Sequence, residues 1–239
     1  MVLENKKILI LVIIIIVVIL LIVLFVVFNI FKPLSSPVIE EECKIIVESE
    51  GENKIDIVFL TDKVNEKNVD NYIDYLLSSE PYSENKDKFN FYYAGETDCD
   101  ILREFLYCYS KKLIKKSSIC PNDYIIVLAD EVSSIRSSAY INVISLNINH
   151  NKNVVLHEFG HIFGNLADEY VPSVFPKGAE NCVRDCDSFK DYGVNDCYEG
   201  CTKSNYYRSS EDSVMKTLRT EDYKELNIIL LKEILEKYE

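Results

Sequence analysis

His157, Glu158 and His161 form an HExxH sequence, which is the arrangement of residues in this chain with the clearest chemical meaning. On an α-helix, residues four apart lie on one face about one turn apart, so both imidazoles can bind the same zinc ion. Glu158 can then act as the general base that activates a water for peptide hydrolysis. The sequence therefore predicts a zinc metalloendopeptidase, with His157 and His161 as metal ligands and Glu158 as the catalytic residue.

Chance is a poor explanation for this motif. The chain of 239 residues has only 3 histidines, and two of them fall within these five positions. A chain of this composition would contain about 0.004 such matches at random. Without a ligand, burying three polar side chains on an apolar helix would cost about 1 to 3 kcal/mol for each. We therefore interpret the motif as a metal site.

A catalytic zinc site usually has three protein ligands and one open position, so a third ligand is needed. His150, the remaining histidine, lies in a polar turn where we expect a solvated side chain. Asp168 would lie about 10 Å beyond His161 along the axis if the helix continued. Gly164 and Asn165 favour a left-handed turn that ends the helix and brings the chain back. We predict Asp168 as the third zinc ligand.

Two other carboxylates stay open as the third ligand. Glu169 follows Asp168 directly, and we expect it to point away from the metal or to support the ligands. Glu180 lies at the distance from the second histidine that a gluzincin uses, but Pro176 and Gly178 disfavour a helix around it. Asp168 is therefore preferred over both.

Residues 8–28 form a run of 21 apolar residues without a charge, which as a helix would be about 31 Å long. That length matches the hydrocarbon core of a bilayer, and the run is too long for a cleaved signal peptide. Lys6 and Lys7 precede it, which favours a cytoplasmic N-terminus. We predict a single-pass protein of the cell membrane, with residues 1–31 as cytoplasmic stub and transmembrane helix, residues 32–42 as a tether, and an extracellular domain.

The cysteine content agrees with an extracellular domain, because eight cysteines are too many for a reduced cytosolic domain without metal or redox chemistry. Four of them form a cluster in which each pair is separated by three residues. Two helical turns facing each other would pair Cys182 with Cys201 and Cys186 with Cys197. Free thiols and a four-cysteine metal site remain alternatives for this cluster. The sequence leaves four cysteines unassigned: Cys43, Cys99, Cys108 and Cys120.

Residues 43–239 are predicted to fold as an α/β domain. Short β-branched or aromatic runs predict strands at residues 54–60, 89–93, 124–129 and 139–148. Apolar residues at helical spacing predict helices at residues 68–77, 102–113, 154–163 and 220–238, the last with Thr220 as its N-cap. This divides the domain into an upper α/β part, residues 43–164, and a lower cysteine-rich part, residues 165–239, which ends in a helix.

Composition excludes other classes of protein. With 48% hydrophobic residues, 7 Gly and 6 Pro, the chain is neither low-complexity nor collagen-like. Its net charge of -13 argues against nucleic acid as a partner, since that binding depends on Lys and Arg neutralising phosphates. The expected partners are a protein or peptide substrate and, through the N-terminal helix, the membrane.

The segment HEFGHIFGNLADEY, residues 157–170, resembles the zinc signature of the IgA-peptidase family (metallopeptidase family 64), a group of metzincin-type zincins. That signature also continues from HExxH into a segment similar to LADEY. KIDIVFL at residues 54–60 resembles the family's first strand, and DYIIVLAD at residues 123–130 its central strand. For about residues 54–216, the resemblance implies a metzincin-like peptidase with a mixed sheet, an active-site helix and a methionine turn around Met215 beneath the metal.

Two other classes of function stay open. One is a non-catalytic, disulfide-stabilised extracellular binding domain that retains a structural zinc site. The other is a membrane-tethered structural protein without a metal. Zinc content distinguishes the last class from the first two, and a peptide-library assay distinguishes the peptidase from the binding domain. The motif itself does not define the substrate.

Overall fold

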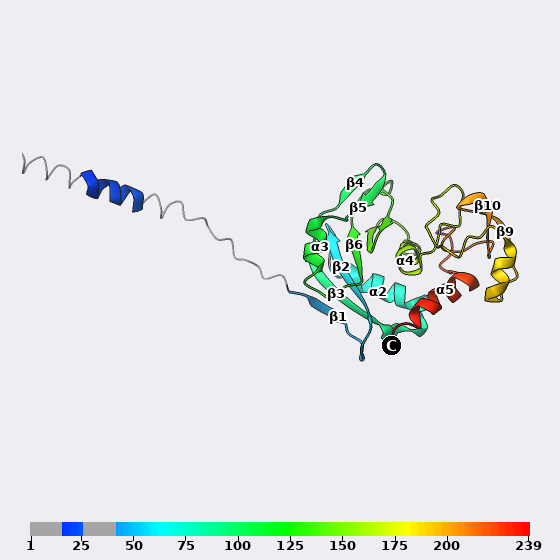
Figure 1. Cartoon of the computed structure of the whole chain (residues 1–239). Helices are drawn as coiled ribbons and strands as arrows, with labels where there is room; N and C mark the ends of the chain where they lie inside the picture. The colour runs from blue at the N-terminus through cyan, green and yellow to red at the C-terminus, as the bar shows by residue number, and fades with distance from the viewer. Residues whose placement is uncertain (1–15, 26–41) are drawn as a thin grey trace, which may run out of the picture. The chain divides into compact units, whose positions relative to one another are not determined.

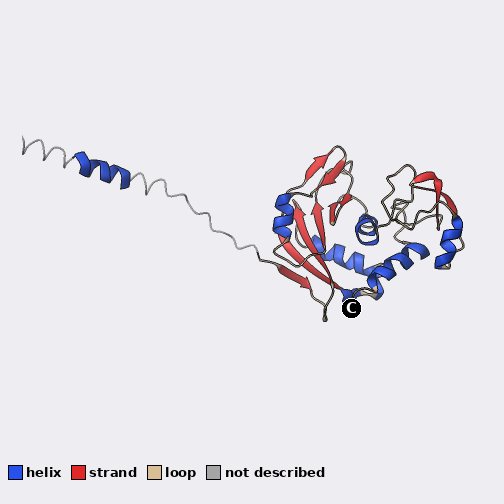
Figure 2. Cartoon of the chain, viewed as in Figure 1, coloured by secondary structure: helices blue, strands red, loops and turns tan. Residues whose placement is uncertain are grey.

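The computed structural model describes residues 16–25 and 42–239 (Figure 1). The chain divides into two units, residues 1–40 and 41–239, and each is described by itself. Residues 16–25 are helical (Figure 2). Within the described residues, no helix is both long and apolar enough to cross a bilayer. The rest of the predicted span, residues 8–15 and 26–28, lies outside the described residues, so the membrane span stays a prediction.

A six-stranded mixed sheet is the scaffold of the second unit, with the strand order β1-β3-β2-β6-β8-β7. The four inner strands run parallel, and the two edge strands pair antiparallel to their neighbours. The inner strands are β2 (Ile55–Asp62), β3 (Phe89–Glu96), β6 (Tyr124–Ala129) and β8 (Val143–Asn147), and the edge strands are β1 (Lys44–Val47) and β7 (Ser138–Tyr140). This mixed α/β architecture confirms the predicted fold class at that level.

The alternation of side chains along β2 shows which helices cover each face of the sheet. Ile57 and Phe59 belong to the main core, which they share with α2 (Asn68–Ser78), α4 (Val154–Gly164) and α5 (Glu225–Leu235). Val58 and Leu60 face a second cluster, which includes Leu113 from α3 (Lys111–Ser117). Figure 1 shows α3 on the side of the sheet opposite α2. The helix α4, which carries the HExxH sequence, therefore packs in the larger of these two clusters.

The predicted helix at residues 102–113 is wrong. The chain instead forms a hairpin of β4 (Asp100–Leu102) and β5 (Phe105–Tyr107), and the helix α3 begins only at Lys111. Arg103 in the hairpin turn has a φ of 61°, which no α-helix allows. The apparent helical spacing counted Leu102 and Phe105, which are 60% and 40% exposed, as part of a buried face.

Two other predicted elements have different limits. Residues 139–148 form two strands, β7 and β8, because Ile141 adopts a φ of 58° at the turn between them. The C-terminal helix α5 begins at Glu225 because Lys224 has a φ of 68°. Thr220 is therefore not its N-cap. In contrast, α2 and α4 lie where the sequence predicts them.

The structure pairs all eight cysteines, so none is free. Cys182–Cys201 and Cys186–Cys197 confirm the predicted connectivity of the cluster. The predicted helical hairpin is wrong, because this region consists of a 3₁₀ helix, η3 (Cys186–Tyr192), and a hairpin of β9 (Tyr198–Cys201) and β10 (Lys203–Arg208). The remaining bonds are Cys43–Cys120 and Cys99–Cys108. Two further 3₁₀ helices, η1 (Tyr82–Glu84) and η2 (Lys86–Lys88), precede β3.

Candidate metal centre

The helix α4 ends at Gly164, where the sequence predicts its end. Asn165 adopts the left-handed conformation, with a φ of 48°, and forms the C-cap. The backbone N–H of Leu166 donates to the carbonyl oxygen of Gly160 at 3.1 Å, which turns the chain back along the helix. Asp168 thereby returns to the level of His161, which a continuous helix would not allow.

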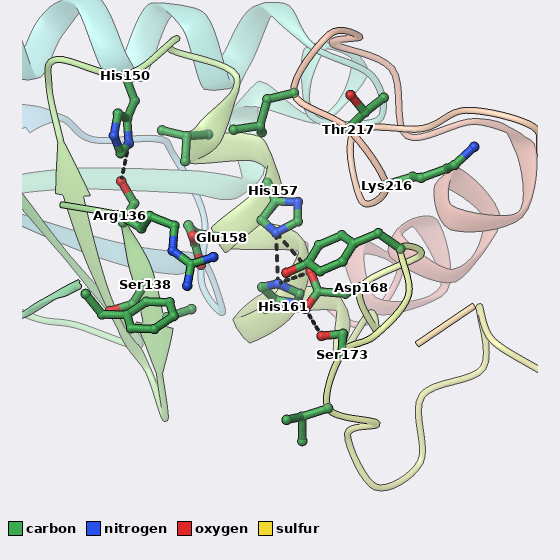
Figure 3. Close-up of a pocket in the computed structure, with 17 residues that line it drawn as sticks. Arg136, Ser138, His150, His157, Glu158, His161, Asp168, Ser173, Lys216 and Thr217 are labelled. Atoms are coloured by element: carbon green, nitrogen blue, oxygen red, sulfur yellow. Dashed lines mark hydrogen bonds and ion pairs between the residues drawn. The ribbon is translucent and has the colours of Figure 1, made fainter. Parts of the chain in front are cut away.

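The structure brings the three predicted ligands together (Figure 3). The Nε2 atoms of His157 and His161 lie 3.1 Å apart. Oδ1 of Asp168 lies 3.1 Å from the first of these nitrogens and 3.3 Å from the second. These three residues form a group that could hold a metal ion within the described part of the chain.

Backbone carbonyls fix the orientation of both imidazoles. Nδ1 of His157 donates to the carbonyl oxygen of Val214 at 2.9 Å, and Nδ1 of His161 donates to that of Leu166 at 2.7 Å. In a neutral imidazole the other nitrogen is then an acceptor. Oδ1 of Asp168 is buried and has no hydrogen-bond partner. With both imidazoles neutral, three acceptor atoms therefore converge on one point, an arrangement that a bound cation stabilises.

The pKa values show that this arrangement attracts positive charge. Burial lowers the pKa of His161, but the adjacent carboxylate of Asp168 and the negative charge of Glu158 outweigh it and raise the pKa to about 9. Burial raises the pKa of Asp168, but the two adjacent histidines hold it well below its usual range. Burial raises the pKa of Glu158, and the adjacent histidines oppose this rise in part.

The three ligand atoms face a cavity of about 590 Å³. Glu158, which is 7% exposed, lies on its wall. Ser138 and Ala139 of the edge strand β7 line another side, and Tyr170 lines a third. The site therefore opens into a space that can admit a ligand, and the carboxylate of Glu158 lies beside the histidines.

A turn around Met215 lies directly against α4, as the family resemblance implies. The N–H groups of Lys216 and Thr217 both donate to the carbonyl oxygen of Ser213 at 3.0 Å, which closes the turn. Met215 is fully buried. A Cβ atom on Gly160 would lie 2.7 Å from Sδ of Met215, so the turn approaches the helix too closely for any side chain at this position unless Met215 shifts.

The other candidate ligands lie apart from this group. Glu169 is fully buried and accepts hydrogen bonds from Asn181, Asn227 and Ser213, so its carboxylate is engaged within the protein. Glu180 is exposed and accepts a hydrogen bond from the hydroxyl of Tyr192. His150 lines the cavity, but its Nε2 donates to the carbonyl oxygen of Ser133 at 3.0 Å. Each therefore belongs to a different set of contacts from the three converging atoms.

Sequence reasoning missed two residues that line the cavity. Arg136 precedes β7 in a segment without any motif, and it reaches the cavity only because tertiary pairing places it there. Tyr170 received no role from the sequence, yet it is 42% exposed and lines the cavity beside Asp168. Comparison with models of protein families and with curated proteins finds no match for this chain. The geometry of the site is therefore the basis for its proposed chemistry.

Proposed function

We propose that this chain is a metzincin-like zinc metalloendopeptidase in which His157, His161 and Asp168 hold zinc and Glu158 is the general base. The convergence of the three acceptor atoms carries this proposal. Ligand atoms about 2.1 Å from a tetrahedral centre lie about 3.4 Å from one another. The separations of 3.1, 3.1 and 3.3 Å approach that value. Two imidazole nitrogens and one carboxylate oxygen are also a ligand set that suits zinc.

Lewis-acid activation of water and of the scissile carbonyl is the chemistry that zinc supplies in such sites. The carboxylate of Glu158 takes the proton of the attacking water and then delivers it to the leaving amine. Burial raises the pKa of Glu158, which brings it nearer to the range in which a carboxylate can both accept and return a proton.

Tyr170 supports the same reaction from another wall of the cavity. Burial, together with the negative charge of Asp168, raises the pKa of Tyr170 to about 12. The hydroxyl therefore keeps its proton at neutral pH and can donate a hydrogen bond to an oxygen that gains charge during the reaction.

The edge strand beside the cavity favours an extended peptide as substrate. Tyr140 of β7 pairs with Val143 of β8 across a two-residue turn. Such hairpins close on a hydrogen-bonded pair, so the backbone N–H and C=O of Ala139 point away from β8. Ala139 lines the cavity. A peptide can therefore pair with this edge as an added strand next to Glu158.

The open cavity favours catalysis over a structural role for the metal. Structural zinc sites are closed by four protein ligands, whereas catalytic sites keep one position open. Here three ligand atoms from the described residues converge beside a cavity of about 590 Å³. This arrangement supports a peptidase over a binding domain that retains a structural zinc.

We also propose that the domain is extracellular and anchored by its N-terminal segment. The four disulfides support this location, because such bonds persist in oxidising compartments. The apolar run at residues 8–28 supports the anchor.

Zinc content and hydrolysis test the proposed activity together. The full chain in detergent should contain one zinc per molecule by mass spectrometry, and it should cleave members of a fluorogenic peptide library. A chelator should abolish cleavage, and added zinc should restore it. Stoichiometric zinc without cleavage of any peptide would support the binding domain instead. A chain without any metal would contradict both.

A further inference from the structure

The side chain of Arg136 lines the cavity. Hydrogen bonds of the Arg136 backbone set its position. Its N–H donates to the carbonyl oxygen of Glu104 at 2.8 Å, and its own carbonyl oxygen accepts from the N–H of Leu106 at 2.8 Å. These bonds attach the segment before β7 to the hairpin that carries β5. The side chain is therefore not required to hold the segment in place.

The guanidinium of Arg136 is oriented by one aromatic ring. Its central carbon lies 4.3 Å from the centroid of the Phe105 ring, which also lines the cavity. A guanidinium has five N–H donors in its plane, and stacking on a ring leaves these donors free at its edge. No side-chain hydrogen bond or ion pair of Arg136 occurs among the residues that the structure describes. Figure 3 shows this side chain reaching from the strand side toward the two histidines.

The other charged groups of the cavity already have partners or a role. Lys216 donates to the carbonyl oxygen of Glu211 at 2.5 Å and pairs with Asp212 at 3.2 Å. Glu158 and Asp168 belong to the metal centre described above. Among the described residues that line the cavity, Arg136 is therefore a cation whose side-chain N–H donors have no protein acceptor. The net charge of -13 acts from a distance, but charges beyond about 8 Å are largely screened at physiological salt, so the charged groups that line the cavity matter most for binding.

We propose that Arg136, stacked on Phe105, binds a carboxylate of the peptide substrate and so makes the site selective for acidic peptides. The fork of a guanidinium matches a carboxylate in two parallel hydrogen bonds. The carboxylate comes either from an Asp or Glu side chain or from the C-terminus of the peptide. This inference rests on the proposed function for the identity of the ligand as a peptide.

Binding measured without turnover tests this selectivity. The zinc-loaded full chain carrying Glu158→Gln is titrated with fluorescent peptides that differ in one position, Glu or Gln, and with each peptide as free acid and as C-terminal amide. We expect one carboxylate to tighten binding about ten- to hundredfold, an effect that weakens as salt is raised. Arg136→Gln should remove that difference.

Arg103→Gln provides the matched control, because it removes the same charge from the turn of the neighbouring hairpin and lies outside the cavity lining. It should leave the preference intact. Loss of selectivity for Glu over Gln assigns the side-chain carboxylate, and loss of selectivity for acid over amide assigns the terminal one. Equal binding of all four peptides, or a preference that persists in Arg136→Gln, would overturn the inference. Absence of hydrolysis by the unsubstituted chain would contradict the proposed function and leave this binding result valid.

Discussion

Two regions of the domain position the three proposed metal ligands by different means. His157 and His161 project from α4, which packs in the main core among residues such as Phe159 and Phe163. Asp168 projects from the irregular region that follows, where a small buried cluster includes Ala167, Ala179, Cys182, Cys201 and Tyr206. Two disulfides link this second region. Apolar packing therefore positions the histidines, whereas covalent bonds and polar contacts position the aspartate.

Glu169 is the centre of the polar contacts in the second region. Its carboxylate accepts from Asn181 at 3.2 Å and from Asn227 at 2.9 Å, and also from the hydroxyl of Ser213 at 2.5 Å. Its backbone N–H donates to the carbonyl oxygen of Met215 at 2.9 Å. One side chain thus connects the segment of Asp168 with the cysteine-rich segment, the methionine turn and α5. We therefore expect substitutions in the two regions to have different effects on zinc binding and on stability.

The largest effect should come from Glu158→Gln, which removes the proposed base from α4 and leaves the ligands of both regions in place. We expect the rate of peptide hydrolysis to fall by about 10² to 10⁴, because a positioned general base contributes that much. Zinc content should stay unchanged. Glu180→Gln is the matched control, since Glu180 is exposed and outside the metal group. Activity within about threefold of the unsubstituted chain at equal zinc content would refute the role of Glu158.

Asp168→Ala should weaken zinc binding by more than about a hundredfold, because it removes a direct ligand rather than a supporting residue. Competition with a chromogenic chelator measures the affinity. The variant should keep the fold, since α4 and its apolar contacts are unaffected. Unchanged affinity would exclude the second region as a source of a ligand, and weakened binding by Glu180→Ala would favour that residue in its place.

Glu169→Gln tests the polar contacts of the second region. The new amide cannot accept all three hydrogen bonds, so at least one buried donor loses its partner. We expect zinc affinity to fall about 10- to 100-fold through displacement of Asp168, the range seen for residues that support metal ligands. Glu211→Gln, an exposed substitution of the same type, serves as the control. A loss equal to that of Asp168→Ala would mean that Glu169 itself binds the metal.

Gly160→Ala is the corresponding test of the first region and should have the smallest effect. Its Cβ would lie 2.7 Å from Sδ of Met215 and 3.0 Å from the Tyr223 ring, so these side chains must shift. We expect a loss of about 1 to 3 kcal/mol in the free energy of unfolding, measured with denaturant, and a smaller change in zinc affinity. Unaltered stability would show that the methionine turn can move without cost.

The grouping of His157, His161 and Asp168 could be predicted largely from sequence because local rules determine most of it. Spacing on a helix places His157 and His161, and the Gly164–Asn165 pair ends that helix early enough for Asp168 to return. Strands β2, β3 and β6 were also predictable, since buried parallel strands are continuous apolar runs.

Features that depend on backbone pairing outside the predicted elements could not be predicted in this way. The hairpin of β4 and β5 exposes apolar residues, and their spacing in the sequence resembles that of the buried face of a helix. Arg136 enters the cavity because its backbone pairs with Glu104 and Leu106, about thirty positions earlier. Thr220 does not cap α5, because the N–H of Val214 donates to the carbonyl oxygen of Asp222 and so holds the segment around Asp222 outside the helix.

The disulfide between Cys43 and Cys120 has a mechanical consequence. Cys43 immediately precedes β1, an edge strand that is held to β3 by hydrogen bonds, and its partner lies 77 residues further along the chain. Tension applied to the chain before Cys43 therefore passes through a covalent bond to the loop before β6. The strand β1 does not carry that force, so its hydrogen bonds to β3 are not broken one after another. The force acts instead on β6, in the interior of the sheet.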